Sequence, residues 1–344
     1  MYAFLEKILT FARMENQYIK QFPELMSGKT VLYVHGFGSS GQSGTVGRLR
    51  QVLPNARVVA PDLPVRPEEA LGLLEKTCEQ EKPALVIGTS MGGMYAEMLY
   101  GYDRILTNPA FGIADTMQSH GLTGKQQFFS PRQDGVQEFY VDKTLVKEYR
   151  LVAERNFAHA ADEGEQGHVY GLFGDEDPLV HTYDTFCRHY CQAISFHGGH
   201  RLDDRSFMHS VLPVIRWIDD RQEKRERPII YIGVETLRKL TPQGDDDAYS
   251  SAMKAVRLLI EHYQVFFLAP AKDFSRTEAW LEKYVSVPAW GHTVYTNQRQ
   301  LLYGDYLVEA VETKDSMATR IAFGSDTFKT WDDIIEYFGR LGGQ

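Results

Sequence analysis

The stretch ALVIGTSMGGMYA, residues 84–96, decides the expected fold of the first part of the chain. Its first four residues are apolar and predict a buried strand, whereas a helical pattern follows the paired glycines. The residues between them read G-x-S-x-G, with the serine at position 90. In a strand–turn–helix setting such a serine lies on a sharp, strained turn that projects its Oγ above the sheet. Gly88 and Gly92 fit this geometry because small residues keep the strand and the helix from colliding.

The motif makes Ser90 a candidate nucleophile. The backbone N–H of Met91 would lie at the N-terminus of the following helix, where it can donate to an oxyanion. The alternative interpretation is a Gly/Ser-rich turn that carries no chemistry. The order of the residues downstream bears on this choice.

The residues downstream of Ser90 follow the order that a nucleophilic serine requires. A strand predicted over residues 168–173 leads into a loop with Asp175 and Asp177, and a strand over 193–196 leads into a loop with His200. The order Ser…Asp…His, with a strand before each member, is that of enzymes with a nucleophile elbow. We therefore predict a catalytic triad of Ser90, Asp177 and His200, and Asp175 remains a rival for the acid.

The first two thirds of the chain alternate short apolar runs with helical patterns. Near-continuous apolar strands between helices predict an α/β fold with a mostly parallel sheet and helices on both faces. Strands are expected over residues 30–34, 56–60, 84–87, 104–106, 168–173 and 193–196, and helices over 45–53, 67–79, 92–100, 181–191 and about 206–217. Residues 112–165 break this rhythm and predict an insertion, or lid, over one end of the sheet.

A second glycine cluster, Gly36-Phe37-Gly38-Ser39-Ser40-Gly41, allows a different interpretation. It reads G-x-G-x-x-G after a predicted strand, and Asp62 ends the next strand, which is the pattern of a dinucleotide site. In such a site the helix begins at the glycines, whereas residues 39–44 form a loose Gly/Ser/Gln loop here. Dinucleotide binding at Gly36–Gly41 is therefore the weakest of the functional hypotheses.

As a set, these motifs resemble the α/β-hydrolase superfamily. More narrowly, YVHGFGSSGQSGT, APDLP and IGTSMGGMYA resemble the small esterases of the YqiA/YcfP type, over about residues 29–220. The resemblance implies an oxyanion hole formed by the N–H groups of Phe37 and Met91, with Gly36 and Gly38 beside the substrate. It also favours Asp177 as the acid, because its D-P-L-V setting resembles the usual family position. The implied activity is hydrolysis of a carboxylic ester or thioester, and the rival hypothesis is a non-catalytic binding or assembly protein on the same scaffold.

The clearest boundary is a run of nine polar residues, 219–227, before Pro228. It predicts a first domain over residues 1–220 and a second over 228–344. The second part again has an α/β pattern. Its strands are expected over residues 228–234, 264–268, 305–308 and 320–322, and its helices over 247–263 and 331–341.

The tail of the second part, residues 299–310 and 321–325, is similar to the later part of haloacid-dehalogenase-like (HAD-like) phosphatases. That family places D-x-D after its first strand, where this chain has Gly233-Val234-Glu235. The hydroxyl residue expected after the second strand is replaced by Ala269-Pro270, and the later acidic pair is reduced to Glu309-Ala310. Aspartyl-phosphate chemistry requires these groups. The resemblance therefore implies a degenerate HAD-like domain without phosphatase activity.

Composition limits the remaining possibilities. The 344 residues carry 37 Lys+Arg and 46 Asp+Glu, a net charge of −9, which disfavours nucleic-acid binding. No uncharged apolar run is long enough for a membrane span, and the charged N-terminus does not resemble a secretory signal. Its apolar residues Phe4, Leu5, Ile8, Phe11 and Ala12 fall on one face of a predicted helix.

The three cysteines form no CxxC pair and no even framework, so we expect a reduced, cytoplasmic protein. Cys187 and Cys191 could share a metal with a nearby histidine, but without further ligands in order we expect no metal site. No cofactor is expected either. The expected partner is a small-molecule ester or thioester, and the sequence leaves open whether the chain forms a homo-oligomer.

Overall fold

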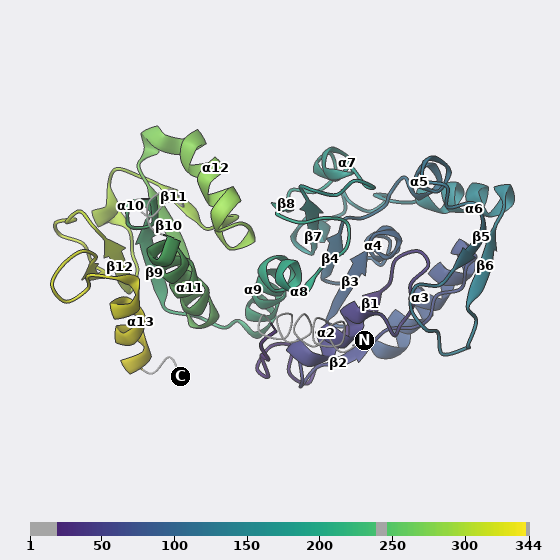
Figure 1. Ribbon diagram of the computed structural model, residues 1–344, viewed down its shortest axis with the longest axis horizontal. Helices are drawn as coiled ribbons and strands as arrows, with labels where there is room; N and C mark the ends of the chain where they lie inside the picture. Colours follow the sequence, from purple (N-terminus) through teal and green to yellow (C-terminus); the bar gives the residue numbers. More distant parts are fainter. Residues whose placement is uncertain (1–18, 239–245, 342–344) are drawn as a thin grey trace, which may run out of the picture. The chain divides into compact units, whose positions relative to one another are not determined.

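The computed structural model of the chain describes residues 19–238 and 246–341 (Figure 1). The apolar face expected over residues 4–12 lies outside these described residues. The chain divides into two compact units, Met1–Gln222 and Glu223–Gln344. Each unit is described by itself below.

The first unit is built on a six-stranded sheet in the order β2-β1-β3-β4-β7-β8, in which every pairing is parallel. Its strands are β1 (Thr30–Val34), β2 (Arg57–Val59), β3 (Leu85–Thr89), β4 (Arg104–Thr107), β7 (Val169–Gly174) and β8 (Ala193–Phe196). The four central strands are buried at nearly every residue, because neighbouring layers cover them on both sides. This arrangement confirms the predicted α/β class and mostly parallel sheet.

The chain first moves outward from β1 to β2 and then returns to β3 and continues toward β8. Right-handed crossovers in opposite directions place helices on opposite faces of the sheet. These helices are α2 (Gly44–Val52), α3 (Pro67–Glu81), α4 (Met91–Glu97), α7 (Tyr183–Cys187), α8 (Asp204–Ser206) and α9 (Leu212–Glu223), with a π-helical segment over Phe207–Val211 between the last two. The helix expected over residues 181–191 is therefore shorter than predicted. The helix expected from about residue 206 to 217 begins at Asp204, contains the π segment and continues to Glu223.

The insertion between β4 and β7 has more regular structure than its composition indicates. It contains α5 (Ile113–Ser119), the antiparallel hairpin of β5 (Gly124–Gln127) and β6 (Glu138–Val141), α6 (Lys143–Ala153) and a 3-10 turn at Glu165–Gly167. The Asp142 side chain caps α6 by accepting a hydrogen bond from the Leu145 N–H at 2.7 Å. The inner face of α6 buries Leu145, Val146, Tyr149 and Val152, so the insertion is packed into the core.

The second unit contains a five-stranded sheet in the order β11-β10-β9-β12-β13, again parallel throughout. Its strands are β9 (Ile229–Gly233), β10 (Gln264–Ala269), β11 (Thr293–Tyr295), β12 (Tyr306–Glu309) and β13 (Thr319–Ala322). Its helices are α10 (Val234–Arg238), α11 (Asp246–His262), α12 (Phe274–Tyr284) and α13 (Trp331–Arg340), with 3-10 turns at Ala271–Asp273, Val287–Ala289 and Arg299–Leu301. Both α12 and β11 are absent from the sequence prediction. The strand order reverses direction at β9, which makes the carboxyl ends of β9 and β12 a topological switch point.

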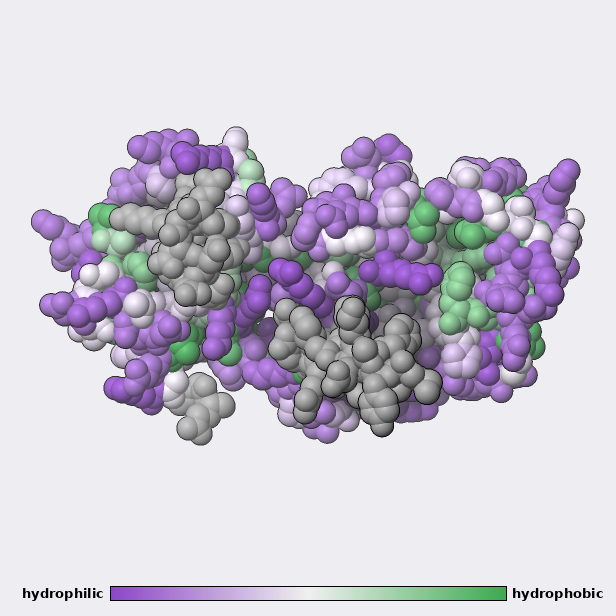
Figure 2. Space-filling model, viewed as in Figure 1, coloured by the Kyte–Doolittle hydropathy of each residue, from purple (hydrophilic) through white to green (hydrophobic). Residues whose placement is uncertain are grey.

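Polar residues dominate the face drawn in Figure 2, and smaller apolar areas lie near the insertion and on the second unit. The insertion exposes several large apolar side chains: Phe129, Val136, Tyr140 and Leu151. None of the helices over the described ranges has both the length and the apolar composition needed to cross a membrane.

Candidate active site

Ser90 lies on the turn between β3 and α4, with φ 55° and ψ −121°. A positive φ is unusual for a residue with a side chain and marks local strain at this turn. The turn is possible because Gly88 and Gly92, two residues before and after Ser90, have no side chains. A Cβ at Gly88 would lie 2.3 Å from the Gly92 carbonyl oxygen, and one at Gly92 would lie 2.0 Å from the Val34 oxygen. The glycines of the motif are therefore required by packing.

Three side chains form a hydrogen-bonded chain at this turn. The Nε2 atom of His200 lies 3.0 Å from Ser90 Oγ, and its Nδ1 atom lies 2.8 Å from Asp177 Oδ2. His200 comes from the loop after β8, and Asp177 from the loop after β7. The amide of Asn108 holds the histidine loop by donating to the carbonyl oxygens of Gly199 and His200 at 3.1 and 3.3 Å. Sequence reasoning missed this contribution of Asn108, a residue with a φ of 45° directly after β4.

Asp177 is buried, with 4% of its surface exposed. Burial by itself would raise the pKa of its carboxyl group. The hydrogen bonds from His200 and from the backbone N–H groups of Leu179 and Val180 outweigh that effect, and the pKa is lowered. Asp177 is thereby held as a carboxylate facing the imidazole.

Asp175, the rival acid, faces a different histidine. Its Oδ2 atom lies 3.2 Å from Nδ1 of His197, and its Oδ1 atom accepts from the Gly198 N–H at 3.0 Å. Both side chains of the Asp175–His197 pair are more than half exposed. The pair therefore lies outside the Ser90–His200–Asp177 chain.

The loop after β1 carries the predicted oxyanion residues. A Cβ at Gly36 would lie 3.3 Å from Ser90 Cβ and 3.9 Å from its Oγ, so this loop packs against the serine. Over residues 19–238 and 246–341, we find no protein acceptor for the Phe37 N–H. The Met91 N–H lies in the first turn of α4, where N–H groups lack intrahelical acceptors.

His35 fixes the orientation of this loop. Its Nε2 atom accepts a hydrogen bond from the Leu63 N–H at 3.0 Å, which leaves Nδ1 as the donor to the Gly36 carbonyl oxygen at 2.9 Å. Because C=O and N–H point in opposite directions across a trans peptide, holding the Gly36 oxygen also aims the Phe37 N–H. Burial lowers the pKa of His35 from 6.5, so the ring is kept neutral.

Asp62, the candidate ribose ligand, is engaged within the protein. Its Oδ1 atom accepts from the Gly41 N–H at 2.7 Å, and its Oδ2 atom accepts from the Gln133 N–H at 2.6 Å. A Cβ at Gly41 would lie 2.0 Å from the Ala60 carbonyl oxygen, so this glycine also serves close packing. Helix α2 begins only at Gly44, beyond the glycine cluster. These contacts disfavour the dinucleotide interpretation.

The insertion covers the loop after β1 with aromatic side chains. Phe37 makes edge-to-face contacts with Phe139 and Tyr149, with ring centroids 5.2 and 6.3 Å apart. The Tyr149 hydroxyl donates to the Val65 carbonyl oxygen at 2.9 Å and lies 3.3 Å from Met91 Sδ. Sequence reasoning missed Tyr149, although the apolar face of the helix that carries it is visible in residues 143–153.

In the second unit, the three positions expected to carry phosphatase chemistry lie at strand ends. Gly233 ends β9, Ala269 ends β10 and Glu309 ends β12. Glu309 is fully buried and accepts hydrogen bonds from the Thr313 N–H and Oγ1 at 2.7 and 2.6 Å. It also pairs with Arg320 at 2.9 Å.

An arginine lies between the two acidic residues at these strand ends. The Arg299 guanidinium binds Glu235 through both oxygens, at 2.8 and 2.9 Å, and lies 3.4 Å from Glu309 Oε2. The magnesium ion that the HAD-like resemblance implies does not fit, because its carboxylate ligands are already neutralised by a guanidinium. Over the described residues, no group of three or more His, Cys, Asp or Glu side chains is placed so that it could hold an ion.

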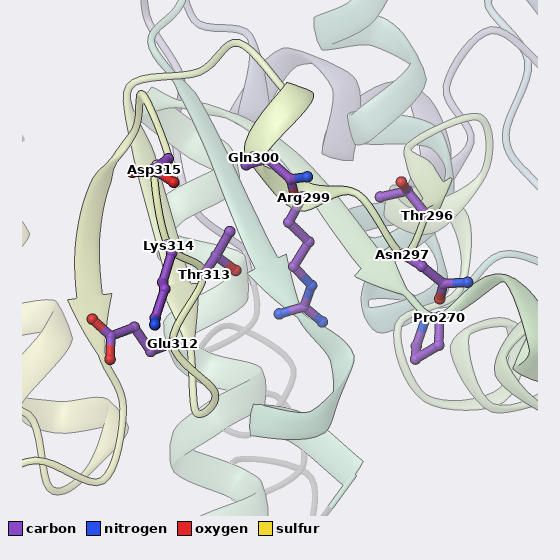
Figure 3. A pocket seen from close by; sticks show the side chains of 9 residues that line it. All are labelled: Pro270, Thr296, Asn297, Arg299, Gln300, Glu312, Thr313, Lys314 and Asp315. Atoms are coloured by element: carbon purple, nitrogen blue, oxygen red, sulfur yellow. The ribbon is translucent and has the colours of Figure 1, made fainter.

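Beside Arg299 the second unit has a pocket of about 460 Å³ (Figure 3). The side chains of Arg299 and Lys314 extend in the same direction along its wall. Glu312 and Asp315 also contribute to the lining, so the pocket is lined by two positively and two negatively charged side chains. It contains no nucleophile in the position that the phosphatase resemblance requires.

A family model described as "Uncharacterised protein family (UPF0227)" matches residues 30–156, from the start of β1 to just beyond α6. This match falls within the part of the chain expected to resemble a hydrolase. Among curated proteins, the chain is similar to the "Putative 5'(3')-deoxyribonucleotidase" of Vibrio phage KVP40. The two are 25% identical over 150 residues, which cover 34% of this chain and 88% of the phage protein.

Solved structures with similarity to this chain include several hydrolases. Est1E from Butyrivibrio proteoclasticus has a TM-score of 0.40 and 12% identity, covering 59% of this chain and 91% of its own. The N-acyl homoserine lactonase AidH has a TM-score of 0.39 and 16% identity, and the match covers 57% of this chain and 92% of the AidH chain. The thioesterase domain from the curacin biosynthetic pathway has a TM-score of 0.36 and 16% identity, and the match covers 58% of this chain and 92% of the thioesterase domain. The α/β fold assignment rests on the sheet topology itself.

Proposed function

We propose that the first unit is a serine hydrolase that cleaves a carboxylic ester or an acyl thioester. The observation that carries the proposal is the hydrogen-bonded chain from Ser90 Oγ through His200 to the buried Asp177. The strained elbow at Ser90, the Met91 N–H in the first turn of α4 and the Gly36 loop packed against Ser90 support the same function. The names of the similar structures, an esterase, a lactonase and a thioesterase, are consistent with this substrate class.

The proposed reaction has two halves. Ser90 Oγ attacks the acyl carbonyl carbon while His200 Nε2 takes its proton, and the carbonyl oxygen becomes an oxyanion near the Phe37 and Met91 N–H groups. The tetrahedral intermediate expels the alcohol or thiol, which receives the proton from His200, and an acyl-enzyme remains. Water then repeats the sequence, so that the carboxylic acid leaves and Ser90 recovers its proton. Each oxyanion donor of this kind contributes about 2.7–4 kcal/mol to lowering the barrier.

Asp177 has two roles in this proposal. Its hydrogen bond to Nδ1 fixes the tautomer in which Nε2 can accept the Ser90 proton. Its negative charge then stabilises the imidazolium that forms. The lowered pKa of Asp177 supports this role, because the carboxylate must remain charged throughout the cycle.

Covalent labelling tests the proposal directly. A fluorophosphonate probe should label the wild-type protein at Ser90, and phenyl esters or acyl thioesters should be hydrolysed. Ser90→Ala should lose both signals, whereas Ser39→Ala, which changes a serine of the neighbouring glycine-rich loop, should keep both. Equal labelling and turnover in Ser90→Ala and wild type would reject the proposal in favour of a non-catalytic binding or assembly protein.

We further propose that the second unit, over residues 228–344, is a degenerate HAD-like domain without phosphatase activity. The Arg299–Glu235 pair and the Gly233 and Ala269 positions support this. The purified chain should not hydrolyse 4-nitrophenyl phosphate with added Mg²⁺. Turnover that disappears in Glu235→Gln would contradict the proposal. A cytoplasmic location belongs to the same set of proposals and is supported by three cysteines that form no disulfide.

A further inference from the structure

An arginine directly after the candidate catalytic histidine has a specific structural setting. The guanidinium carbon of Arg201 lies 5.1 Å from the ring centroid of Phe129. Arg201 is exposed, and no ion pair joins it to a carboxylate anywhere in residues 19–238 or 246–341. Several other arginines of this unit, such as Arg48 and Arg132, are paired with nearby acids.

Phe129 connects the two loops that flank Ser90. Its backbone N–H donates to the Gly38 carbonyl oxygen at 2.7 Å, and its ring would contact a Cβ at Gly38 at 2.8 Å. Gly38 belongs to the loop of the predicted oxyanion hole, whereas Arg201 belongs to the loop of His200. The Phe129 ring, with 64% of its surface exposed, therefore lies between these loops at the edge of the site.

The contact leaves the hydrogen-bonding capacity of Arg201 available. A cation–π contact draws on the positive charge of the guanidinium and does not require its N–H donors. These five N–H donors lie in the plane of the group and point outward from its rim, in a fork that matches a carboxylate or phosphate. The backbone beside Arg201 is also fixed, because Asn108 holds the carbonyl oxygen of His200 at 3.3 Å.

We propose that Arg201, held against Phe129, is an anion subsite of the hydrolase and selects esters or thioesters that carry a negatively charged group. The inference rests on the proposed function, because the subsite adjoins the Ser90 centre. The recognised chemistry is a carboxylate or phosphate group on the substrate. That group belongs either to the acyl chain or to the leaving group, and matched substrates distinguish these two sources.

The test uses phenyl hexanoate, phenyl hydrogen adipate and 4-carboxyphenyl hexanoate with the full-length protein. The first ester is neutral, the second carries a carboxylate on the acyl side, and the third carries one on the leaving group. Wild type should have a higher kcat/KM for one of the anionic esters than for the neutral one. Arg201→Gln should lower that value about 10- to 100-fold, mostly through KM, as expected for loss of a charged hydrogen bond.

The control measurements separate this role from a structural one. Arg201→Gln should change kcat/KM for phenyl hexanoate less than about twofold and leave fluorophosphonate labelling of Ser90 intact. Arg201→Lys should recover only part of the anionic preference, because an ammonium lacks the planar fork. Arg188→Gln removes one positive charge from the exposed residue after α7 and should have no effect on the preference.

The results can reject the inference alone or together with the proposed function. If phenyl hexanoate is hydrolysed but the ratio of anionic to neutral kcat/KM is the same in wild type and Arg201→Gln, the subsite is rejected and the hydrolase stands. If none of the esters turns over and Ser90 is not labelled, both are rejected. The preferred ester identifies whether the charge belongs to the acyl group or to the leaving group.

Discussion

Asp175 and Asp177 lie two residues apart and face different histidines: Asp177 is 2.8 Å from His200 Nδ1, and Asp175 is 3.2 Å from His197 Nδ1. The geometry therefore predicts effects of very different size for the same substitution at the two positions. Asp177→Asn should lower kcat for ester hydrolysis by about 10⁴-fold, because the imidazole loses the partner that fixes its tautomer. Asp175→Asn should change kcat only slightly. Steady-state kinetics on one ester would test both, and a larger loss in Asp175→Asn would move the acid role to Asp175.

His35 should affect the rate without touching the substrate. Its hydrogen bond to the Gly36 oxygen aims the Phe37 N–H, so His35→Gln should misalign this proposed oxyanion donor. We expect kcat to fall about 10²-fold with little change in KM, since the donor acts mainly in the transition state. His120→Gln, at the exposed end of α5, is the matched control and should leave both constants unchanged. A loss confined to KM would argue that His35 shapes binding alone.

The neutral state of His35 also predicts how stability depends on pH. Its pKa is lowered from 6.5 in the folded protein, so below pH 6.5 the unfolded chain binds a proton that the folded chain does not. The free energy of unfolding should therefore decrease as the pH falls below 6.5 and level off below the folded pKa. Urea titrations at several pH values would measure the slope for the first unit. The slope should be smaller in His35→Gln, and an equal slope in the two proteins would assign it to other groups.

Gly92→Ala should destabilise the first unit. The added Cβ would lie 2.0 Å from the Val34 oxygen, which belongs to a central strand and cannot move aside easily. We expect the free energy of unfolding to fall by about 1–3 kcal/mol or more. Gly72→Ala is the matched control, because Gly72 lies in α3 with open space around its Cβ position. It should stabilise the protein by about 0.5–1 kcal/mol, and urea denaturation compares the two. Equal stability of these variants would show that the elbow tolerates a side chain.

Arg299→Gln should destabilise the second unit. It would leave Glu309 buried with one cation fewer and remove the bidentate partner of Glu235. Breaking a buried ion pair from one side costs about 3–5 kcal/mol. Calorimetry should show a lower temperature for the unfolding transition of the second unit, whereas Arg276→Gln, on the exposed side of α12, should leave that temperature unchanged.

Mn²⁺ titration followed by electron paramagnetic resonance should show no tight Mn²⁺ site in the wild-type protein. A tight site in the wild type would contradict the assignment of Arg299 as the cation that neutralises these glutamates.

The alternation of apolar runs and helical patterns was sufficient to predict the parallel sheet of the first unit. Strands such as Thr30–Val34 and Ala193–Phe196 agree with the prediction residue for residue, because each is a short, mostly apolar and mostly buried run. The insertion was harder to predict. One strand of its hairpin, Gly124–Gln127, is a polar and half-exposed run without apolar alternation. Strand β11, of three residues, gives too short a pattern to be recognised.

The candidate site was predictable where a backbone motif required particular residues. The order of Ser90, Asp177 and His200 in the chain was visible because each follows a strand. The residues that hold these three side chains and their loops in place could not be predicted from the sequence. Asn108 and Tyr149 act through contacts with segments distant in the sequence, and neither belongs to a local motif. Likewise, no spacing in the sequence indicates that Arg299 neutralises two glutamates.

The two oxygens of Asp62 tie the glycine-rich loop to the insertion, one through Gly41 and the other through Gln133. An insertion exchanged between related proteins would therefore have to supply an N–H donor to Asp62 Oδ2 in place of Gln133. A graft over residues 112–165 without such a donor leaves one Asp62 oxygen without its partner and loosens the loop beside Ser90. Asp62 makes the insertion and the glycine-rich loop a single module for protein engineering.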